Sequence, residues 1–343
     1  MKKLILIIMI LITLSSCIPN NKQQNIKYEI TFDNCGFGTE VNRISNVNKL
    51  PEELPILFDD EYKFIGWYLD SNYTLIAEED ITINSNITLY AKWEKLVITE
   101  GLDFVLSSTG LDYVLYGFTD NSVKDVVIPS EYNDKPVKYI GAGAFMGDNK
   151  IESVMIPSSV EIIDEHAFSS CENLKYISVG KGVKEIDKYA FCNLPTLQKI
   201  VVDSNNLTFD SRKNCNAIIE KNTDTLVVGC NGTIIPNSVT TIAKYAFYGS
   251  GITNITIPKS VFTICESAFN NCTNLTTIVI LENLCTINDF AFVKCEKLKT
   301  IFNNSNLELT IGDEKNGKVA YYAEQIYNKG EWSYINGIPT PNK

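Results

Sequence analysis

An alanine–phenylalanine pair recurs through the second half of the chain at a nearly constant spacing. The pairs begin at Ala144, Ala167, Ala190, Ala246, Ala268 and Ala291, with steps of 23, 23, 56, 22 and 23 residues. An isoleucine stands four residues before each alanine, and another aliphatic residue stands seven before it. A unit this short cannot bury its own apolar side chains, so neighbouring units must stack into one continuous core. The pattern therefore predicts a solenoid.

A Leu-x-x-Ile-x-aliphatic element, such as Leu174-x-x-Ile177-x-Val179, follows several of the pairs. Because side chains alternate along a strand, this element predicts one short strand per repeat, with alternate residues facing outward. An exposed apolar stripe often marks an interaction site, whereas scattered exposed apolar residues are normal. We expect the outward positions to form a binding face, which comprises Met155, Tyr176, Ser178, Lys199, Val201, Asn254, Thr256, Thr277, Val279, Thr300 and Phe302.

This pattern resembles the BspA-type leucine-rich repeat, and the match runs from about Val126 to Phe302. The resemblance implies a mainly β repeat solenoid of short parallel strands, in proteins that mediate adhesion and interaction at cell surfaces. We place the solenoid at residues 128–303, an N-terminal cap at 95–127 and a C-terminal cap at 304–343. Within the C-terminal cap, residues 318–328 are expected to form a helix.

The 56-residue step contains a variant segment, a hairpin insertion at residues 203–233. Two apolar stretches, 217–220 and 225–228, flank a polar turn and predict the two strands of a hairpin. Cys215 and Cys230 lie equally far from its centre, which would place them opposite each other. The sequence leaves two alternatives open here: a disulfide, or two reduced thiols packed side by side.

Residues 27–94 form a separate region with alternating apolar stretches at 28–32, 64–68 and 87–93, each of which predicts a strand. The Gly66-Trp67-Tyr68 and Leu89-Tyr90-Ala91-Lys92-Trp93 motifs resemble those of the Listeria–Bacteroides repeat. The resemblance implies a small β-grasp-like α+β module, used as a spacer or accessory unit. Trp67, Tyr68 and Trp93 would suit an interface, but for so small a module we expect them to be core residues.

The first residues have the character of a targeting signal. Lys2 and Lys3 precede an apolar run from Leu4 to Leu14, which is shorter than the roughly 20 residues that cross a bilayer. Leu14-Ser15-Ser16-Cys17 resembles a bacterial lipobox, which implies a signal peptide at 1–16, a lipid on Cys17 and a tether at 17–26. An ordinary cleaved signal peptide with a chance cysteine is the alternative.

Composition excludes several kinds of function. The net charge of −11 and pI of about 4.8 do not provide the positive field that nucleic-acid binding needs. The chain has one histidine, His166, at a variable repeat position, and neither a zinc-ligand spacing nor a phosphate-binding glycine loop. The acidic triplets Asp59-Asp60-Glu61 and Glu78-Glu79-Asp80 lack the alternating oxygen ligands of a calcium loop. We therefore expect no catalytic residues, no metal and no cofactor.

The sequence thus predicts a non-enzymatic, monomeric surface lipoprotein, held on the membrane by the lipid on Cys17. Its expected partner is an extracellular or host-surface protein or glycan, bound by the strand face, and nucleic acid is not expected. The alternative hypothesis is a non-catalytic structural spacer, or an envelope accessory protein for ligand capture.

Overall fold

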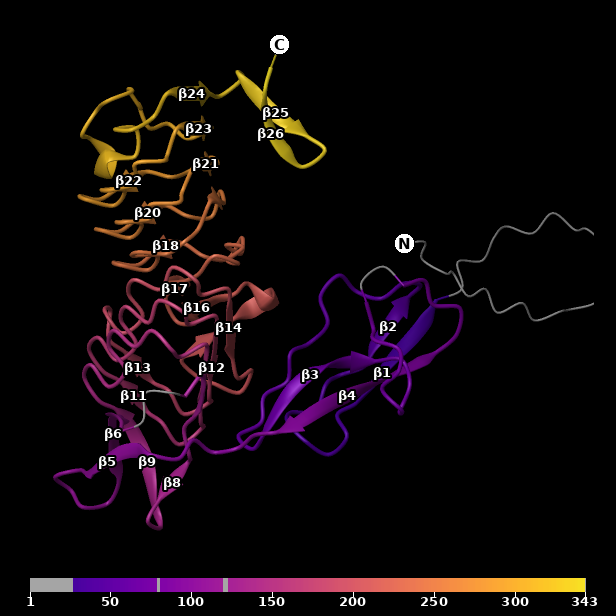
Figure 1. The fold of residues 1–343 in the computed structure, drawn as a ribbon. Helices are drawn as coiled ribbons and strands as arrows, with labels where there is room; N and C mark the ends of the chain where they lie inside the picture. Colours follow the sequence, from indigo (N-terminus) through magenta and orange to yellow (C-terminus); the bar gives the residue numbers. More distant parts are fainter. Residues whose placement is uncertain (1–26, 79–80, 120–122, 343) are drawn as a thin grey trace, which may run out of the picture.

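The computed structural model describes residues 27–78, 81–119 and 123–342. Figure 1 shows an N-terminal module standing out from the side of a long solenoid, whose coils stack in chain order toward the C-terminus. The module is one sheet with the strand order β2-β1-β4-β3. Its strands are β1 (Tyr28–Asp33), β2 (Ile44–Val47), β3 (Tyr62–Tyr68) and β4 (Ile87–Lys95).

Three of the module's strands were predicted from sequence alternation, and β2 was missed. The described part of the module holds no helix, so its fold here is β rather than the α+β that the resemblance implied. Trp67 is buried in its core, and the indole N–H donates to the carbonyl of Pro55 at 2.7 Å. This placement confirms the prediction that Trp67 is a core residue.

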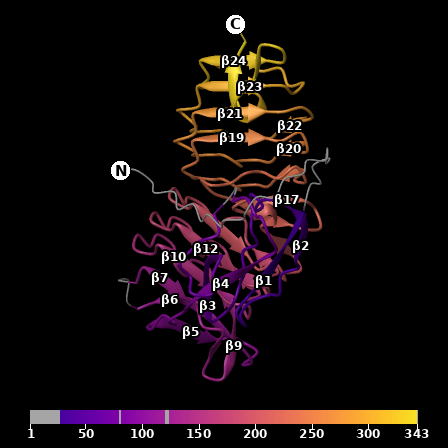
Figure 2. The same cartoon turned by 90° about the vertical axis from the view of Figure 1, so that its right-hand side faces the viewer.

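The predicted strand of each repeat is present, and these strands pair in parallel along one face of the solenoid, the strand face. Two four-stranded sheets make up this face, and Figure 2 looks onto it. They contain β7 (Asp125–Val127), β10 (Ser153–Ile156), β12 (Tyr176–Val179) and β14 (Lys199–Val202), then β19 (Asn254–Ile257), β21 (Thr277–Ile280), β23 (Thr300–Asn303) and β24 (Gln325–Asn328).

Each coil also carries a second short strand, at the isoleucine that stands four residues before the repeat alanine. These strands form the opposite face in two further sheets. The first contains β5 (Leu102–Leu106), β6 (Tyr113–Phe118), β8 (Glu131–Tyr132), β9 (Lys135–Ile140), β11 (Ile162–Ile163) and β13 (Glu185–Ile186). The second contains β15 (Phe209–Asp210), β16 (Ala217–Glu220), β17 (Thr225–Gly229), β18 (Thr241–Ile242), β20 (Thr263–Ile264) and β22 (Thr286–Ile287).

The repeat phenylalanines stack through the core. The ring centroids of Phe145 and Phe168 are 5.2 Å apart and those of Phe269 and Phe292 are 4.9 Å apart, with nearly parallel planes. The residue two positions after each phenylalanine has a positive φ in every repeat, and in the first five repeats its backbone N–H donates to a carbonyl of the next turn. These residues are Gly147, Ser170, Asn193, Gly249, Asn271 and Lys294.

The predicted hairpin of the insertion is present as β16 and β17, and a short 3₁₀ turn, η1 (Arg212–Asn214), precedes it. A β-bulge between Ile218 and Ile219 shifts its register by one residue. The core is divided at this point into two clusters, with Cys215 in the C-terminal one and Cys230 in the N-terminal one. Both thiols are free. The disulfide alternative is therefore wrong, because the bulge directs the two cysteines into separate cores.

The end of the chain also differs from expectation. Residues 318–328 do not form a helix: a 3₁₀ turn, η2 (Asn316–Lys318), precedes β24, which pairs in parallel with β23 and adds one more strand to the strand face. A final antiparallel hairpin of β25 (Trp332–Ile335) and β26 (Ile338–Pro341) then folds back over that face. Figures 1 and 2 both show the hairpin beside β23 and β24.

Candidate functional site

The outward side chains of the strand face form two rows, because the parallel strands pair without a register shift within each sheet. One row aligns Met155 with Ser178 and Val201, and continues in the second sheet with Thr256, Val279 and Phe302. The other aligns Ser153, Tyr176 and Lys199, then Asn254, Thr277 and Thr300. The structure thus brings the predicted binding-face residues together.

The N-terminal module covers the first half of these rows (Figure 2). Met155 is 7% exposed and Val201 is 4% exposed. The Lys63 ammonium of the module lies 5.8 Å from the centroid of the Tyr176 ring. Tyr176 is half-buried, and burial raises the pKa of its phenol to about 12. The pKa of Lys199 is lowered, first by burial and then by the nearby Lys63 charge.

Polar contacts fix the module on the solenoid. An Asp60 carboxylate oxygen accepts the backbone N–H of Ser158 at 2.8 Å. The Asn205 side-chain amide donates to the Thr39 hydroxyl at 2.8 Å, and that of Asn214 donates to a backbone carbonyl of the module at 3.1 Å. These contacts come from the turn after β10 and from two points of the insertion, so the module is held along the face rather than at one hinge.

The C-terminal hairpin covers the far end of the same face. Val279 and Phe302 are 4% and 5% exposed, and they pack with Trp332 of β25 in one apolar cluster. The expectation that the apolar stripe is open to solvent is therefore wrong for Met155, Val201, Val279 and Phe302. Their apolar character is explained by packing within the chain.

An open window remains on the strand face between the module and the hairpin. We define this window by Ile234, Asn254, Thr256, Thr277 and Leu281. Ile234 is 77% exposed, Asn254 and Thr256 are exposed, and the other two are half-buried. A depression of about 260 Å³ lies here, lined by Ile234, Asn254, Thr256 and Leu281 among others. Ile234 and Leu281 were missed from the sequence because they stand beside the strands rather than in them.

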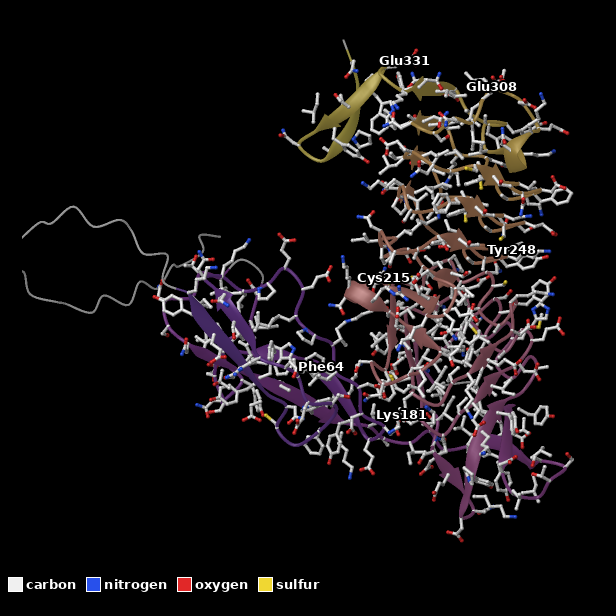
Figure 3. All side chains as sticks on the ribbon, turned by 180° about the vertical axis from the view of Figure 1, so that it is seen from behind. Phe64, Lys181, Cys215, Tyr248, Glu308 and Glu331 are labelled. Carbon is white, nitrogen blue, oxygen red and sulfur yellow. The ribbon has the colours of Figure 1, made fainter. Side chains whose placement is uncertain are left out.

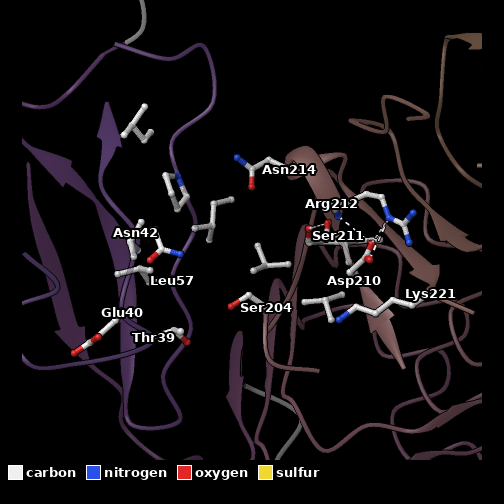
Figure 4. A pocket seen from close by; sticks show the side chains of 17 residues that line it. Thr39, Glu40, Asn42, Leu57, Ser204, Asp210, Ser211, Arg212, Asn214 and Lys221 are labelled. Atoms are coloured by element: carbon white, nitrogen blue, oxygen red, sulfur yellow. Dashed lines mark hydrogen bonds and ion pairs between the residues drawn. The ribbon is translucent and has the colours of Figure 1, made fainter. Parts of the chain in front are cut away.

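A larger cleft of about 560 Å³ lies where the module meets the insertion (Figure 4). Arg212 in its wall pairs with Asp210 at 2.8 Å and with Asp224 at 2.5 Å. The Lys221 ammonium donates to the backbone carbonyl of Asn206. Arg212 and Lys221 both bind groups of the chain itself. Neither therefore offers a free cation to a ligand in the cleft, and neither forms an acid–base pair that is open to one.

The buried thiols have no nucleophilic character. Burial raises the pKa of Cys171 and Cys192 to about 12 and that of Cys215 and Cys230 to about 11, so they stay protonated, whereas catalysis needs the thiolate. The Cys171 thiol instead donates to the Phe145 carbonyl of the preceding coil at 3.0 Å. Cys272 and Cys295 make the same contact with their own preceding coils. These three thiols therefore link adjacent coils.

The described residues contain no group of three or more histidines, cysteines and acids placed to hold a metal. Asp59 accepts backbone N–H groups of Glu61 and Tyr62, so its carboxylate stabilises its own loop. Among the same residues, no helix has the length and apolar character needed to span a bilayer. Cys17, the predicted lipidation site, lies outside the described residues, as do Glu79 and Asp80.

A scan against protein-family models decides what the coil pattern represents. The BspA-type leucine-rich repeat region matches in six copies over residues 115–223 and 228–315. The chain belongs to the BspA-type leucine-rich repeat family. The N-terminal module of this BspA-type protein matches the Listeria-Bacteroides repeat domain over residues 28–92. The family match begins at residue 115, within the segment that we had assigned to the N-terminal cap.

Solved structures of several bacterial leucine-rich repeat proteins resemble this BspA-type chain. The T. pallidum leucine-rich repeat protein is 18% identical and aligns over 68% of this chain and 85% of its own, with a TM-score of 0.30. A leucine-rich cell surface protein from Faecalibacterium prausnitzii is 17% identical over 68% and 94% of the two chains, with a TM-score of 0.31. The pneumococcal vaccine antigen PcpA is 15% identical over 68% and 88%, with a TM-score of 0.34. No curated protein matches the sequence.

Proposed function

We propose that this protein is a non-catalytic binding protein of the cell surface, anchored by a lipid on Cys17, which holds a protein partner in the open window of the strand face. The observation that carries the proposal is a difference in exposure among the residues of one outward row of the strand face. Met155, Val201, Val279 and Phe302 are covered by the chain's own modules, whereas Thr256 in the same row is exposed.

The window has the composition of a protein interface. It combines an exposed isoleucine and a half-buried leucine with threonine and asparagine side chains, and protein interfaces have this mixture of apolar contact and hydrogen bonding. The module and the hairpin flank it on the same face. Solenoids use such extended faces to bind partners.

The test is a binding screen of residues 18–343, which keep every residue that the structure describes, against extracellular-matrix proteins and host-cell surfaces. Thr256→Arg places a long cation in the window, and Thr286→Arg is the matched control at an exposed threonine of β22 on the opposite face. We expect saturable binding that Thr256→Arg lowers at least tenfold and Thr286→Arg leaves unchanged. Equal loss in both variants would overturn the window assignment, and absence of binding would favour the spacer hypothesis.

The anchor is tested separately by metabolic labelling with a fatty-acid analogue. Cys17→Ser should abolish labelling and release the protein from the membrane fraction, while Cys35→Ser should do neither. Labelling that persists in Cys17→Ser would overturn the anchor without bearing on the window.

A further inference from the structure

An aromatic ladder lies on the side of the solenoid away from the N-terminal module, where Figure 3 labels Tyr248. It is built from the residue two positions before each repeat phenylalanine, and three consecutive coils place His166, Tyr189 and Tyr245 there. The rings of His166 and Tyr189 stack with centroids 5.1 Å apart, and those of Tyr189 and Tyr245 are 4.6 Å apart.

Tyr189 and Tyr245 are 56 residues apart in the sequence, yet they are neighbours on this side. The backbone N–H of Asn193 donates to the carbonyl of Tyr248 at 2.7 Å, which joins the two coils directly. The Tyr189 hydroxyl also donates to that of Tyr245 at 3.1 Å. The insertion therefore does not interrupt the stacking of the turns on this side, and it brings the rings of Tyr189 and Tyr245 together.

A hollow of about 350 Å³ lies beside the ladder. One wall consists of the ladder rings and Tyr248, whose centroid is 5.9 Å from that of Tyr245. The other wall consists of the left-handed residues of the neighbouring turns, including Ser170, Asn193 and Asn271. Tight packing holds this wall in place, since a Cβ atom at Gly249 would lie 2.4 Å from the side-chain oxygen of Asn193.

The chemistry of the walls limits what the hollow can bind. None of the residues that line it carries an acidic, lysine or arginine side chain. Some polar groups of the walls nevertheless lack hydrogen-bond partners. The Asn193 amide donates to Ser170 at 3.1 Å, and among the contacts of the described residues the Asn271 side chain has none. Such unpaired polar groups favour a neutral ligand rich in hydroxyl groups.

We propose that this hollow is a second binding site, for a neutral pyranose unit of a glycan. A pyranose ring has an apolar C–H face that packs on aromatic rings, and an equatorial rim of hydroxyl groups that matches the amide groups of the other wall. An anionic sugar would bring a charge that no lining residue balances, and desolvating an unpaired charge is costly. The site is independent of the strand-face window and lies on the other side of the solenoid.

The experiment is binding of residues 18–343 to an array of neutral oligosaccharides (glucosides, galactosides, mannosides and N-acetylhexosaminides), with sialylated and sulfated glycans as the charged arm. Tyr248→Ala removes one ring, and Asn271→Ala removes the free amide. Phe290→Ala is the matched control, because Phe290 occupies the same ladder position, is exposed and does not line the hollow. Thermal unfolding checks that each variant is folded.

We expect at least one neutral glycan to bind saturably, with a tenfold or greater loss of affinity in Tyr248→Ala and Asn271→Ala and none in Phe290→Ala. The strand-face variant Thr256→Arg should leave this binding unchanged, which separates the two sites. The inference is overturned if no neutral glycan binds, if charged glycans bind better, or if Phe290→Ala weakens binding as much as the two lining variants.

Discussion

The indole ring of Trp332 packs on the phenyl ring of Phe302, with centroids 5.2 Å apart. This contact places the last hairpin of the chain on the strand face that the repeats build. Phe302 also stacks on Tyr327 of β24, at 5.2 Å. A two-stranded hairpin is at best marginally stable alone, so this apolar contact is what holds β25 and β26 in place.

Replacing Trp332 by alanine should release the hairpin while the coils stay folded. Removing a buried indole costs about 3 kcal/mol or more, and Val279 and Phe302 would then be exposed. We expect stronger binding of a hydrophobic dye and faster proteolysis after residue 328. The control is Ile335→Ala, at an exposed position of the same strand, and it should change neither signal.

Trp332→Phe distinguishes packing from hydrogen bonding at this site. The indole N–H of Trp332 is buried without a partner, so phenylalanine keeps an aromatic ring and removes an unsatisfied donor. Its stability should lie within about 1 kcal/mol of the wild type. A loss as large as that of Trp332→Ala would contradict this account of the contact.

The N-terminal module should be displaced by a charge placed beneath it. Val201→Glu buries a carboxylate at a 4% exposed position, and burying an unpaired charge costs more than the roughly 1–3 kcal/mol of an unpaired neutral polar group. Undocking of the N-terminal module would expose the carboxylate to water and so avoid that cost. We expect a larger radius of gyration by X-ray scattering, with repeat secondary structure unchanged by circular dichroism. Thr256→Glu, at the matching outward position of β19, should leave the radius unchanged; expansion in both variants would argue against the docked module.

The periodic positions of the sequence were sufficient to predict the repeats, the strand register and the hairpin of the insertion. Each of these depends on local alternation or on a spacing that repeats, such as the isoleucine before each Ala-Phe pair. The strand β24 lies within residues 318–328, which were predicted to form a helix. Pairing with β23 decided its conformation, and such tertiary pairing overrides local propensity.

The covering of the strand face could not be predicted, because docking of one module on another leaves no periodic signal. The apolar excess at Met155, Val201 and Phe302 was visible in the sequence, but it does not say whether the covering surface belongs to the same chain. The aromatic ladder left a signal in the sequence that was interpreted only as a variable repeat position. His166, Tyr189 and Tyr245 occupy one repeat position, and only the structure shows that the 56-residue step closes there.

Gly229 should tolerate no side chain. A Cβ atom at this position would lie 2.2 Å from a ring carbon of Phe247, and the Gly229 N–H donates to the carbonyl of Ala246 at 2.8 Å. Gly229→Ala should therefore destabilise the protein by about 1–3 kcal/mol, measured by chemical unfolding. Adding Phe247→Leu should recover part of the loss, since a smaller side chain makes room. If the double variant is less stable than the sum of the single effects, the steric explanation fails.

Glu152 should titrate well below an ordinary glutamate. Its carboxylate accepts from Lys175 at 2.7 Å and from Lys124 at 2.9 Å, and these hydrogen bonds lower its pKa from 4.5 to about 2. Because the folded-state pKa is depressed, the stabilisation is fully present above pH 4.5 and is lost as the pH falls toward 2. Salt should weaken it, since the group is near the surface.

Carboxyl-detected NMR titration measures this pKa directly. Lys175→Met removes the hydrogen bond that lowers this pKa most, so the pKa of Glu152 should rise toward 4.5 and the acid limb of the stability profile should flatten. Lys150→Met removes a lysine that is close in sequence but makes no contact with Glu152 among the described residues, and it should leave the titration unchanged. A wild-type pKa near 4.5 would show that the bridge between the three coils does not persist in solution.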